Sequence, residues 1–319
     1  MSAPQDVLRI GTRASALART QSAQVAELLG ARLGRPVELV EVTTAGDRSQ
    51  AAGTPLAGSS TTGVFVSALR DALLDGRVDV AVHSLKDLPT YAADGITLAA
   101  IPVREDPRDV VVARDGLTLG ELPVGSRVGT GSPRRVAQLH ALGLGLDVVG
   151  VRGNVDTRIS KVRSGEYDAV VLARAGLARL GRLTEATEVL DPLQMLPAPG
   201  QGALGVECRS GDDLASLLGG ALDDRHARAA VEAERAVLAT LEGGCSAPIG
   251  VLAELVEGED DEEIWVRAVA LSLDGALSVR MSATGDPADA VGVGTRLASE
   301  MLADGAAELS VTADKRQNV

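Results

Sequence analysis

The chain has 319 residues, a net charge of −13 and an apolar fraction of 45%, but only one Trp, two Tyr and one Phe. Because single hydrophobic cores stop growing at roughly 250 to 300 residues, this length predicts two or three domains. The acidic charge and the scarcity of aromatic rings disfavour nucleic acid as a partner, and the charge also disfavours an anionic membrane.

The first hundred residues alternate apolar strand segments with amphipathic helix segments. Strands are expected at 7–12, 37–44 and 78–84, and helices at 15–29 and 64–74. The apolar segment ITLAAIPV follows, and the charged, proline-containing stretch REDPRD after it is typical of a hinge. Such alternation is typical of α/β proteins with largely parallel sheets.

A second alternating set begins directly after this hinge. Strands are expected in DVVVAR, SRVGT, LDVVGVRG and YDAVVLAR, with helices at 133–142 and 155–164. LPAPGQGA, residues 196–203, marks a second break. The two sets predict two α/β lobes with a crevice between them.

The last hundred residues follow a different pattern. A long helix is expected at 223–241, two antiparallel strands in IWVRAVALSL and ALSVRMSAT, and a closing helix at 286–302. The final residues, TADKRQNV, are expected to fray. This part predicts a smaller α+β domain behind the two lobes.

Cationic side chains are concentrated in one part of the chain. Residues 127–182 hold ten cationic and four acidic side chains, a net charge of +6, which leaves −19 for the rest. Nine of the ten cations are arginine, whose planar fork binds carboxylate or phosphate at two points. This favours a compact anionic ligand, because a large polyanion would be repelled by the remaining chain. Solvated helix surfaces would explain the same arginines without a ligand, and that alternative stays open.

The segment VGTGSPRR, residues 128–135, ends a strand and begins a helix. Ser132 is a favoured N-cap residue and Pro133 suits the first helical position, so Arg134 and Arg135 fall in the first turn. Two cations there oppose the helix dipole unless an anion lies among them and the backbone N–H groups, and the segment therefore predicts an anion site. Comparable junctions present Arg152 and Arg158 in RGNVDTR, and Arg13 and Ser15 in TRAS.

The segment HSLKDLPT, residues 83–90, follows the apolar run VDVAV. Buried strands usually end in turn residues such as Gly, Asn or Pro. This one ends with His83, Ser84, Lys86 and Asp87 within five positions. Four chemically capable side chains at one strand end call for a functional explanation.

The two cysteines, Cys208 and Cys245, lie 37 residues apart and form no CxxC pair, so neither a disulfide framework nor a zinc site is expected. Cys208, within ALGVEC, is expected to be a small buried residue. Cys245 follows two glycines in LEGGCSAPIG, and on such a loop it is either structural or a nucleophile. MSAPQDVLRI lacks a signal-peptide pattern and no run of 18 apolar residues occurs, so a reducing cytoplasm is expected.

Two weaker signals, a glycine motif and the scattered histidines, indicate neither a dinucleotide cofactor nor a metal site. GQGALG, residues 200–205, formally matches GxGxxG, but it leads into an apparent strand rather than a helix, which disfavours a dinucleotide site. His140 and His226 lie in helical patterns and are expected at the surface, and three scattered histidines assemble no metal site.

Eight motifs occur in order along the chain: TRASALARTQ, HSLKDLPT, REDPRD, GTGSPRR, RGNVDTR, GEYDAVVLARAGLARL, LPAPGQGALGVECR and LEGGCSAPIG. Together they resemble the porphobilinogen deaminases, also called hydroxymethylbilane synthases, of tetrapyrrole and haem biosynthesis. The resemblance implies two periplasmic-binding-protein-like (type II) lobes with mainly parallel sheets plus a smaller α+β C-terminal domain. The expected division is 1–102 with 201–220, then 103–200, then 221–319.

The resemblance also implies a cytoplasmic, monomeric transferase with a covalent dipyrromethane cofactor and no metal. Four porphobilinogen molecules are joined head to tail on that cofactor with release of ammonia. The resemblance assigns catalysis to Asp87, cofactor binding to Cys245 as the attachment point, Lys86, Ser84, Ser132, Arg134 and Arg135, and substrate binding to Arg13, Ser15, Gln21, Arg152, Arg158, Arg179 and Gln201. One departure is the loop around 50–63, where LAGSSTTGVF lacks the lysines that family members often carry.

Two other functions remain as alternatives. Two lobes, a hinge and an arginine-lined crevice also describe a solute-binding protein without catalysis. The GQGALG match leaves a nucleotide-dependent oxidoreductase or transferase as the second alternative.

Overall fold

The computed structural model describes residues 7–42, 61–211, 213–241, 248–258 and 261–309, with only the backbone described for 61–65. The chain forms two compact units, which are described separately. Unit 1 comprises Met1–Glu105 and Ala203–Arg228. Unit 2 comprises Asp106–Gly202 and Ala229–Val319.

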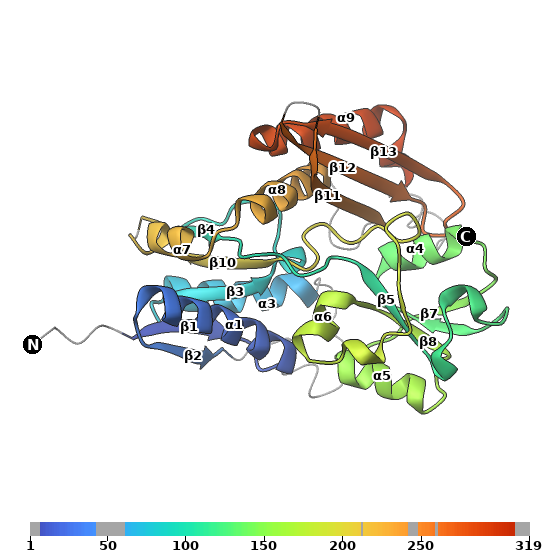
Figure 1. Cartoon of the computed structure of the whole chain (residues 1–319), viewed down its shortest axis with the longest axis horizontal. Helices are drawn as coiled ribbons and strands as arrows, with labels where there is room; N and C mark the ends of the chain where they lie inside the picture. The colour runs from blue at the N-terminus through green and yellow to red at the C-terminus, as the bar shows by residue number, and fades with distance from the viewer. Residues whose placement is uncertain (1–6, 43–60, 212, 242–247, 259–260, 310–319) are drawn as a thin grey trace, which may run out of the picture. The chain divides into compact units, whose positions relative to one another are not determined.

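Unit 1 is built around a five-stranded sheet with helices on both faces (Figure 1). Its strands, in sheet order, are β2 (Val37–Glu41), β1 (Leu8–Thr12), β3 (Val80–Ser84), β10 (Leu204–Arg209) and β4 (Ile96–Ala100). Neighbours β2, β1 and β3 are parallel, whereas β10 is antiparallel to both β3 and β4. Four of the five strands therefore run in one direction.

The helices of unit 1 explain why strand β3 is apolar on both faces. Helices α1 (Ala16–Leu33) and α7 (Leu214–Leu222) share a core with Val80 and Val82 of β3. Helix α3 (Thr61–Leu74) packs against Ala81, which points to the opposite face. Because both faces of β3 are covered, the strand reads as a continuous apolar run.

Unit 2 contains a second sheet with the same topology. Its order is β7 (Asp147–Val149), β6 (Arg127–Gly129), β8 (Ala169–Ala173), β5 (Asp109–Ala113) and β9 (Glu188–Val189), with β5 antiparallel to both neighbours. Helices α4 (Pro133–Ala141), α5 (Val155–Arg163) and α6 (Arg174–Arg179) accompany it. The antiparallel strand comes early here, as β5, but late in unit 1, as β10. The chain therefore passes from one lobe to the other twice.

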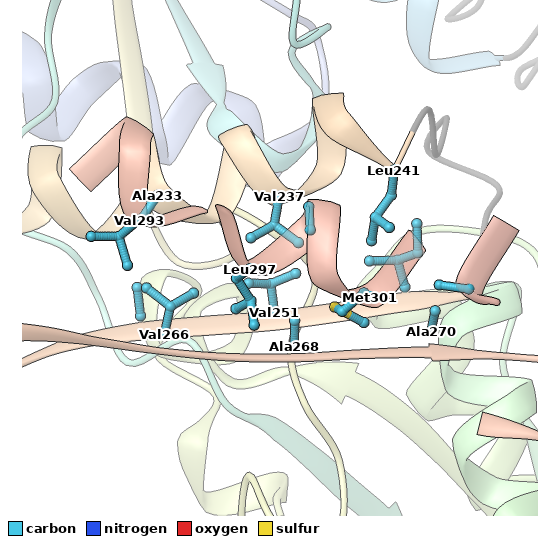
Figure 2. Packing of buried hydrophobic residues seen from close by; sticks show 14 of the residues in the cluster. Ala233, Val237, Leu241, Val251, Val266, Ala268, Ala270, Val293, Leu297 and Met301 are labelled. Atoms are coloured by element: carbon cyan, nitrogen blue, oxygen red, sulfur yellow. The ribbon is translucent and has the colours of Figure 1, made fainter. Parts of the chain in front are cut away.

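The remainder of unit 2 is an α+β layer. Strands β11 (Ile249–Glu257), β12 (Glu262–Leu271) and β13 (Ser278–Gly285) form an antiparallel meander. Figure 2 shows Val237 of α8 (Arg225–Thr240) and Leu297 of α9 (Ala290–Ala303) lying over Val251 and Val266 of the sheet. A smaller cluster on the opposite face joins this sheet to α4, through Leu252, Val269, Leu271, Ala137 and Leu196. The fold of two mainly parallel lobes plus a smaller α+β part is thus confirmed.

The structure differs from the predicted elements at several places, and helix α6 and strand β9 are among the elements that were not predicted. Helix α1 continues to Leu33 rather than Leu29, because Gly30 is tolerated inside it and Gly34, at φ 62°, ends it. Helix α7 was not predicted, since its segment LASLLGGAL contains two glycines, yet it packs on the sheet of unit 1. Strand β11 was also missed, because it directly follows the Gly-rich segment around Cys245.

Candidate functional site

The end of β3 is a short turn that exposes two charged side chains. A 3-10 turn, η1 (Leu85–Asp87), begins directly after Ser84. Leu85 donates its N–H to the Ala203 carbonyl, and Leu88 donates back to Leu85. The side chains of Leu85 and Leu88 are buried, whereas those of Lys86 and Asp87 are half-buried. Two apolar anchors therefore fix the turn and leave the predicted catalytic and cofactor-binding side chains accessible.

The opposite strand leaves room for this turn only because it carries a glycine. A Cβ atom at Gly205 of β10 would lie 2.8 Å from Leu85 Cδ1 and 2.9 Å from Leu88 Cδ1. Real side chains do not approach so closely, so a Cβ at residue 205 would force the side chains of both leucines to shift. The GQGALG segment thus supports the turn, and it leads into strand β10, as the sequence predicted.

The end of β1 lies at the same edge of the unit 1 sheet. Strands β1 and β3 are parallel neighbours, with Ile10 opposite Val80 and Gly11 opposite Ala81. Their carboxyl ends therefore bring Arg13 and Ser15 to the edge that carries the η1 turn. The Ser15 hydroxyl accepts a hydrogen bond from the Ala18 N–H at 3.3 Å and so caps α1. Gln21, the remaining predicted residue of unit 1, is buried within α1.

Beneath the turn lies a buried ionic group that the sequence analysis did not identify. Arg70 of α3 donates from Nε and Nη2 to the two carboxylate oxygens of Glu207 at 3.0 and 2.7 Å. His83 Nε2 lies 3.2 Å from the same carboxylate. Burial raises the pKa of Glu207, but His83 and Arg70 outweigh burial and hold that pKa at about 2. A glutamate inside the apolar strand LGVECR was the available signal.

In unit 2, the two arginines of SPRR converge on one buried carboxylate. Arg134 Nη2 donates to Asp109 Oδ2 at 2.8 Å, and Arg135 Nη2 donates to Asp109 Oδ1 at 2.7 Å. Gln201 Nε2 adds a third hydrogen bond to Oδ1 at 2.8 Å. Asp109 is fully buried, which by itself raises its pKa, but the charges of Arg134 and Arg135 dominate and hold the pKa well below its usual range.

The anion expected at the start of α4 is therefore, at least in part, the chain's own Asp109. The helix begins as predicted, with Ser132 at the N-cap and Pro133 in the first turn, although the Ser132 side chain makes no capping bond. Local sequence correctly indicated that an anion was required there. Nothing in the sequence near the start of α4 indicates that a carboxylate 25 residues earlier supplies this anion.

Each of these arginines has one guanidinium nitrogen without a hydrogen-bond partner among the described residues. Arg134 Nη1 donates to the Leu196 carbonyl, and Arg135 Nη1 donates to the Val171 carbonyl at 3.0 Å. The Nε atoms of both arginines are buried and have no hydrogen-bond partner among the described residues. Buried charged donors are costly to leave unsatisfied, and because protein atoms cover both Nε atoms, they are closed to a ligand in this conformation.

The other predicted residues of unit 2 have varied environments. Arg158 donates from Nε to the Gly153 carbonyl at 2.8 Å, and its pKa is lowered first by burial and then by the charge of Arg135. Arg152 is exposed. Arg179 Nη2 donates to the Gly202 carbonyl at 2.7 Å, next to Gln201. Cys245 lies outside the described residues, as does most of the segment 50–63.

The basic segment 127–182 divides into two groups. One group pairs with acidic side chains at or near the surface, as in Lys161 with Glu166 at 2.7 Å and Arg163 with Glu185 at 2.6 Å. These match the alternative of solvated helix surfaces. Arg134 and Arg135 form the other group and are buried. Arg134 and Arg135 thus differ from the surface pairs in burial, whereas Arg152 is exposed and Arg158 and Arg179 are half-buried.

Membrane spans and metal sites are the remaining candidate features of the described part of the chain. No helix there is long and apolar enough to span a bilayer. Nor do its His, Cys, Asp and Glu side chains form a group of three or more suited to a metal ion.

Two family models match the chain. The porphobilinogen deaminase, dipyromethane cofactor binding domain matches residues 8–216, and the porphobilinogen deaminase, C-terminal domain matches residues 228–303. Porphobilinogen deaminases of Mycobacterium avium and Mycobacterium tuberculosis are 56% and 57% identical over 308 residues, which cover 95% of this chain and 96% and 98% of those proteins.

Among solved structures, two similar folds belong to other proteins. The BvgS VFT2 domain of Bordetella pertussis is 19% identical with a TM-score of 0.41, covering 67% of this chain and 86% of that one. A putative methionine-binding lipoprotein of Bacillus subtilis is 14% identical with a TM-score of 0.40, covering 68% and 91%.

Proposed function

The chain belongs to the porphobilinogen deaminase family, and on that basis we propose a role for each residue of its site. It is a transferase of tetrapyrrole biosynthesis that uses a dipyrromethane cofactor and joins four porphobilinogen molecules head to tail, releasing ammonia. The observation that carries this conclusion is the pair of family models, which together match most of the chain. We further propose that the enzyme acts as a monomer and that it lies in the cytoplasm. Its two widely spaced cysteines, which suggest no disulfide framework, favour that reducing compartment.

The arginines of unit 2 fit a ligand rich in carboxylates. Each pyrrole ring of the cofactor carries two carboxylates, and the planar guanidinium group of arginine is well suited to bind a carboxylate. Two arginine charges against the single charge of Asp109 also leave a net positive charge. We therefore assign Arg134, Arg135 and Ser132 to cofactor carboxylates. Ser84 and Lys86 are assigned the same role in unit 1.

The thiol of Cys245 is assigned as the covalent attachment point of the cofactor. This assignment rests on the LEGGCSAPIG motif, because Cys245 lies outside the described residues. Cys208 does not compete for the role, since it is buried within strand β10. When bound, the dipyrromethane supplies the pyrrole carbon to which the first substrate is joined.

Asp87 is assigned as the catalytic group. When the amino group of porphobilinogen leaves as ammonia, the substrate carbon that held it becomes cationic. A carboxylate fixed beside that carbon stabilises the developing charge and accepts the pyrrole proton that is lost when the new C–C bond forms. The η1 turn suits this role, because buried Leu85 and Leu88 hold its backbone while Asp87 remains accessible. Lys86, adjacent to it, offers a cation for a carboxylate of the pyrrole.

The remaining predicted residues are assigned to substrate carboxylates, in keeping with the charge that accumulates as rings are added. In unit 1 these are Arg13, Ser15 and Gln21, of which Ser15 also caps α1. In unit 2, Arg152 and Arg158 are assigned to direct contacts. Arg179 and Gln201 hold the backbone at Gly202 and Pro107 in addition to any ligand contact.

We also propose that the chain has three domains, at 1–102 with 201–220, 103–200 and 221–319. Separate hydrophobic cores support this division within the two units. The sheet of unit 1 has its own clusters around Ile10 and Leu69. The β5–β9 sheet and the β11–β13 sheet of unit 2 have distinct clusters around Val171 and Val266, which the smaller cluster around Leu196 joins.

The test of this proposal is ammonia release from porphobilinogen, measured together with hydroxymethylbilane formation. The wild type should release one ammonia per ring joined, and Asp87→Asn should lose about 10²- to 10³-fold in turnover, as removal of a preorganised charge does elsewhere. Asp94→Asn, an exposed residue after the same turn, is the matched control and should retain activity. Near-normal turnover by Asp87→Asn would exclude the assigned role. A solute-binding protein would show no ammonia release at all.

A further inference from the structure

A pocket lies in unit 1 at the edge of the sheet where strand β1 begins. Its volume is about 450 Å³ and it opens to solvent. Five charged side chains line it, and they come from segments that are distant in sequence: Arg9, Arg35, Asp79, Arg209 and Asp213. None of them takes part in the site described above.

The pocket and the catalytic turn lie at opposite ends of strand β3. Asp79 directly precedes this strand, and Ser84 ends it where the η1 turn begins. Five steps of extended chain, at ~3.3 Å each, separate these two residues by roughly 17 Å. A small ligand in the pocket therefore cannot also contact Asp87.

The fold holds the charged groups of the pocket in place. Arg9 donates from Nε and Nη2 to the two carboxylate oxygens of Asp79 at 3.0 and 2.8 Å. Arg209 Nη1 donates to the carbonyls of Leu73 and Val78 at 2.9 and 2.8 Å. Because these guanidinium groups are already ordered, a ligand that binds them would lose less side-chain entropy on binding.

The balance of charge in the pocket favours an anion. Burial raises the pKa of Asp79, but the hydrogen bonds and charge of Arg9 lower it by more, so this carboxylate stays ionised. Three arginines against two aspartates leave the lining with a net charge of +1, in a chain whose net charge is −13. The pocket is thus a positively charged region in an acidic protein.

The rest of the lining is mainly apolar. Leu8 of β1 and Leu214 of α7 are buried, whereas Leu217 is 48% exposed. Leu214 and Leu217 lie three positions apart on α7 and therefore share one face of the helix. A pocket with apolar walls and a few fixed polar groups is typical of sites for small organic molecules.

We propose that this pocket binds a small organic anion, namely a carboxylate attached to an apolar ring or chain. The carboxylate lies among Arg9, Arg35 and Arg209, and the apolar body packs against Leu214 and Leu217. This second binding site is independent of the proposed function, because none of these residues has a role in it.

The first test is a titration of the full-length protein with benzoate, followed through the methyl NMR signals of leucine. Leu214 and Leu217 report on the pocket, whereas Leu85 and Leu88 report on the catalytic turn. Benzoate should shift the signals of Leu214 and Leu217 saturably, and benzyl alcohol, which has the ring but no charge, should leave them unchanged. If benzoate shifted neither of these signals, or shifted only those of Leu85 and Leu88, the inference would be overturned.

The second test measures the affinity for benzoate in variants of the pocket, with far-UV circular dichroism to confirm folding. Arg35→Gln removes one half-buried cation and should weaken binding about tenfold, the effect of one hydrogen bond to a charged group. Leu217→Gln removes part of the apolar wall and should weaken binding about fivefold. Arg77→Gln, which breaks an exposed ion pair with Asp75 in the same unit, is the matched control and should bind benzoate as the wild type does. Unchanged affinity in either pocket variant would overturn the inference.

Discussion

Replacing Glu207 by glutamine removes one buried negative charge from unit 1 while keeping the size of the side chain. The pKa of Glu207 is held at about 2, against an ordinary value of 4.5. Each pKa unit corresponds to about 1.4 kcal/mol, so the charged form is favoured in the folded state by ~3 kcal/mol. Because the folded-state pKa is the lower one, this contribution is complete above the unfolded-state pKa and is lost as pH falls toward 2.

The expected loss can be placed on a pH scale. For these two pKa values the contribution falls from ~3 kcal/mol at pH 5 to ~1.4 kcal/mol at pH 3. The free energy of unfolding of the wild type should therefore drop by about 2 kcal/mol more than that of Glu207→Gln across this window.

The assay is urea unfolding followed by far-UV circular dichroism at pH 5, 4 and 3. The chain's single Trp lies in unit 2 and would not report on Glu207. Glu38→Gln, on exposed β2 of the same unit, is the matched control and should follow the wild type. A constant difference between wild type and Glu207→Gln from pH 5 to pH 3 would refute the assigned electrostatics.

Three further outcomes follow from the contacts described above. Arg134→Met should reduce the free energy of unfolding by ~3–5 kcal/mol, because it removes a partner of buried Asp109. The control Arg163→Met, which breaks an exposed ion pair, should reduce it by at most ~1 kcal/mol in the same urea titration. Arg152→Gln should raise KM for porphobilinogen but change the free energy of unfolding by no more than ~0.5 kcal/mol, since this side chain is exposed. An unchanged KM would show that Arg152 does not contact the substrate. Gly205→Ala should lower the free energy of unfolding by ~1–3 kcal/mol and should also lower kcat, because the added Cβ displaces Leu85 and Leu88. Calorimetry and steady-state kinetics would detect these two effects, and wild-type values would contradict the packing argument.

Local sequence anticipated the parts of the site that depend on local rules. The run VDVAV followed by HSLKD predicted a buried strand ending in reactive side chains, and β3 with its η1 turn has that form. Ser132 and Pro133 predicted where α4 begins, and the two arginines that follow predicted a nearby anion. Each of these signals lies within a few residues of the feature it predicts.

What local sequence could not show depends on distant partners. REDPRD was interpreted as a hinge, yet its last residue, Asp109, is the buried acceptor for arginines 25 and 26 positions later. Strand β10 lies between β3 and β4 although 120 residues separate Ser84 from its partner Leu204. Pairings at such separations are decided by which apolar faces pack together, and no pattern within one segment encodes them.

The most direct test of the account is the intact mass of the wild type and of Cys245→Ser. The wild type should exceed its sequence mass by one dipyrromethane unit, and Cys245→Ser should have the mass of the bare chain and no deaminase activity. A wild type at its sequence mass, or a Cys245→Ser variant that keeps the extra mass, would contradict it.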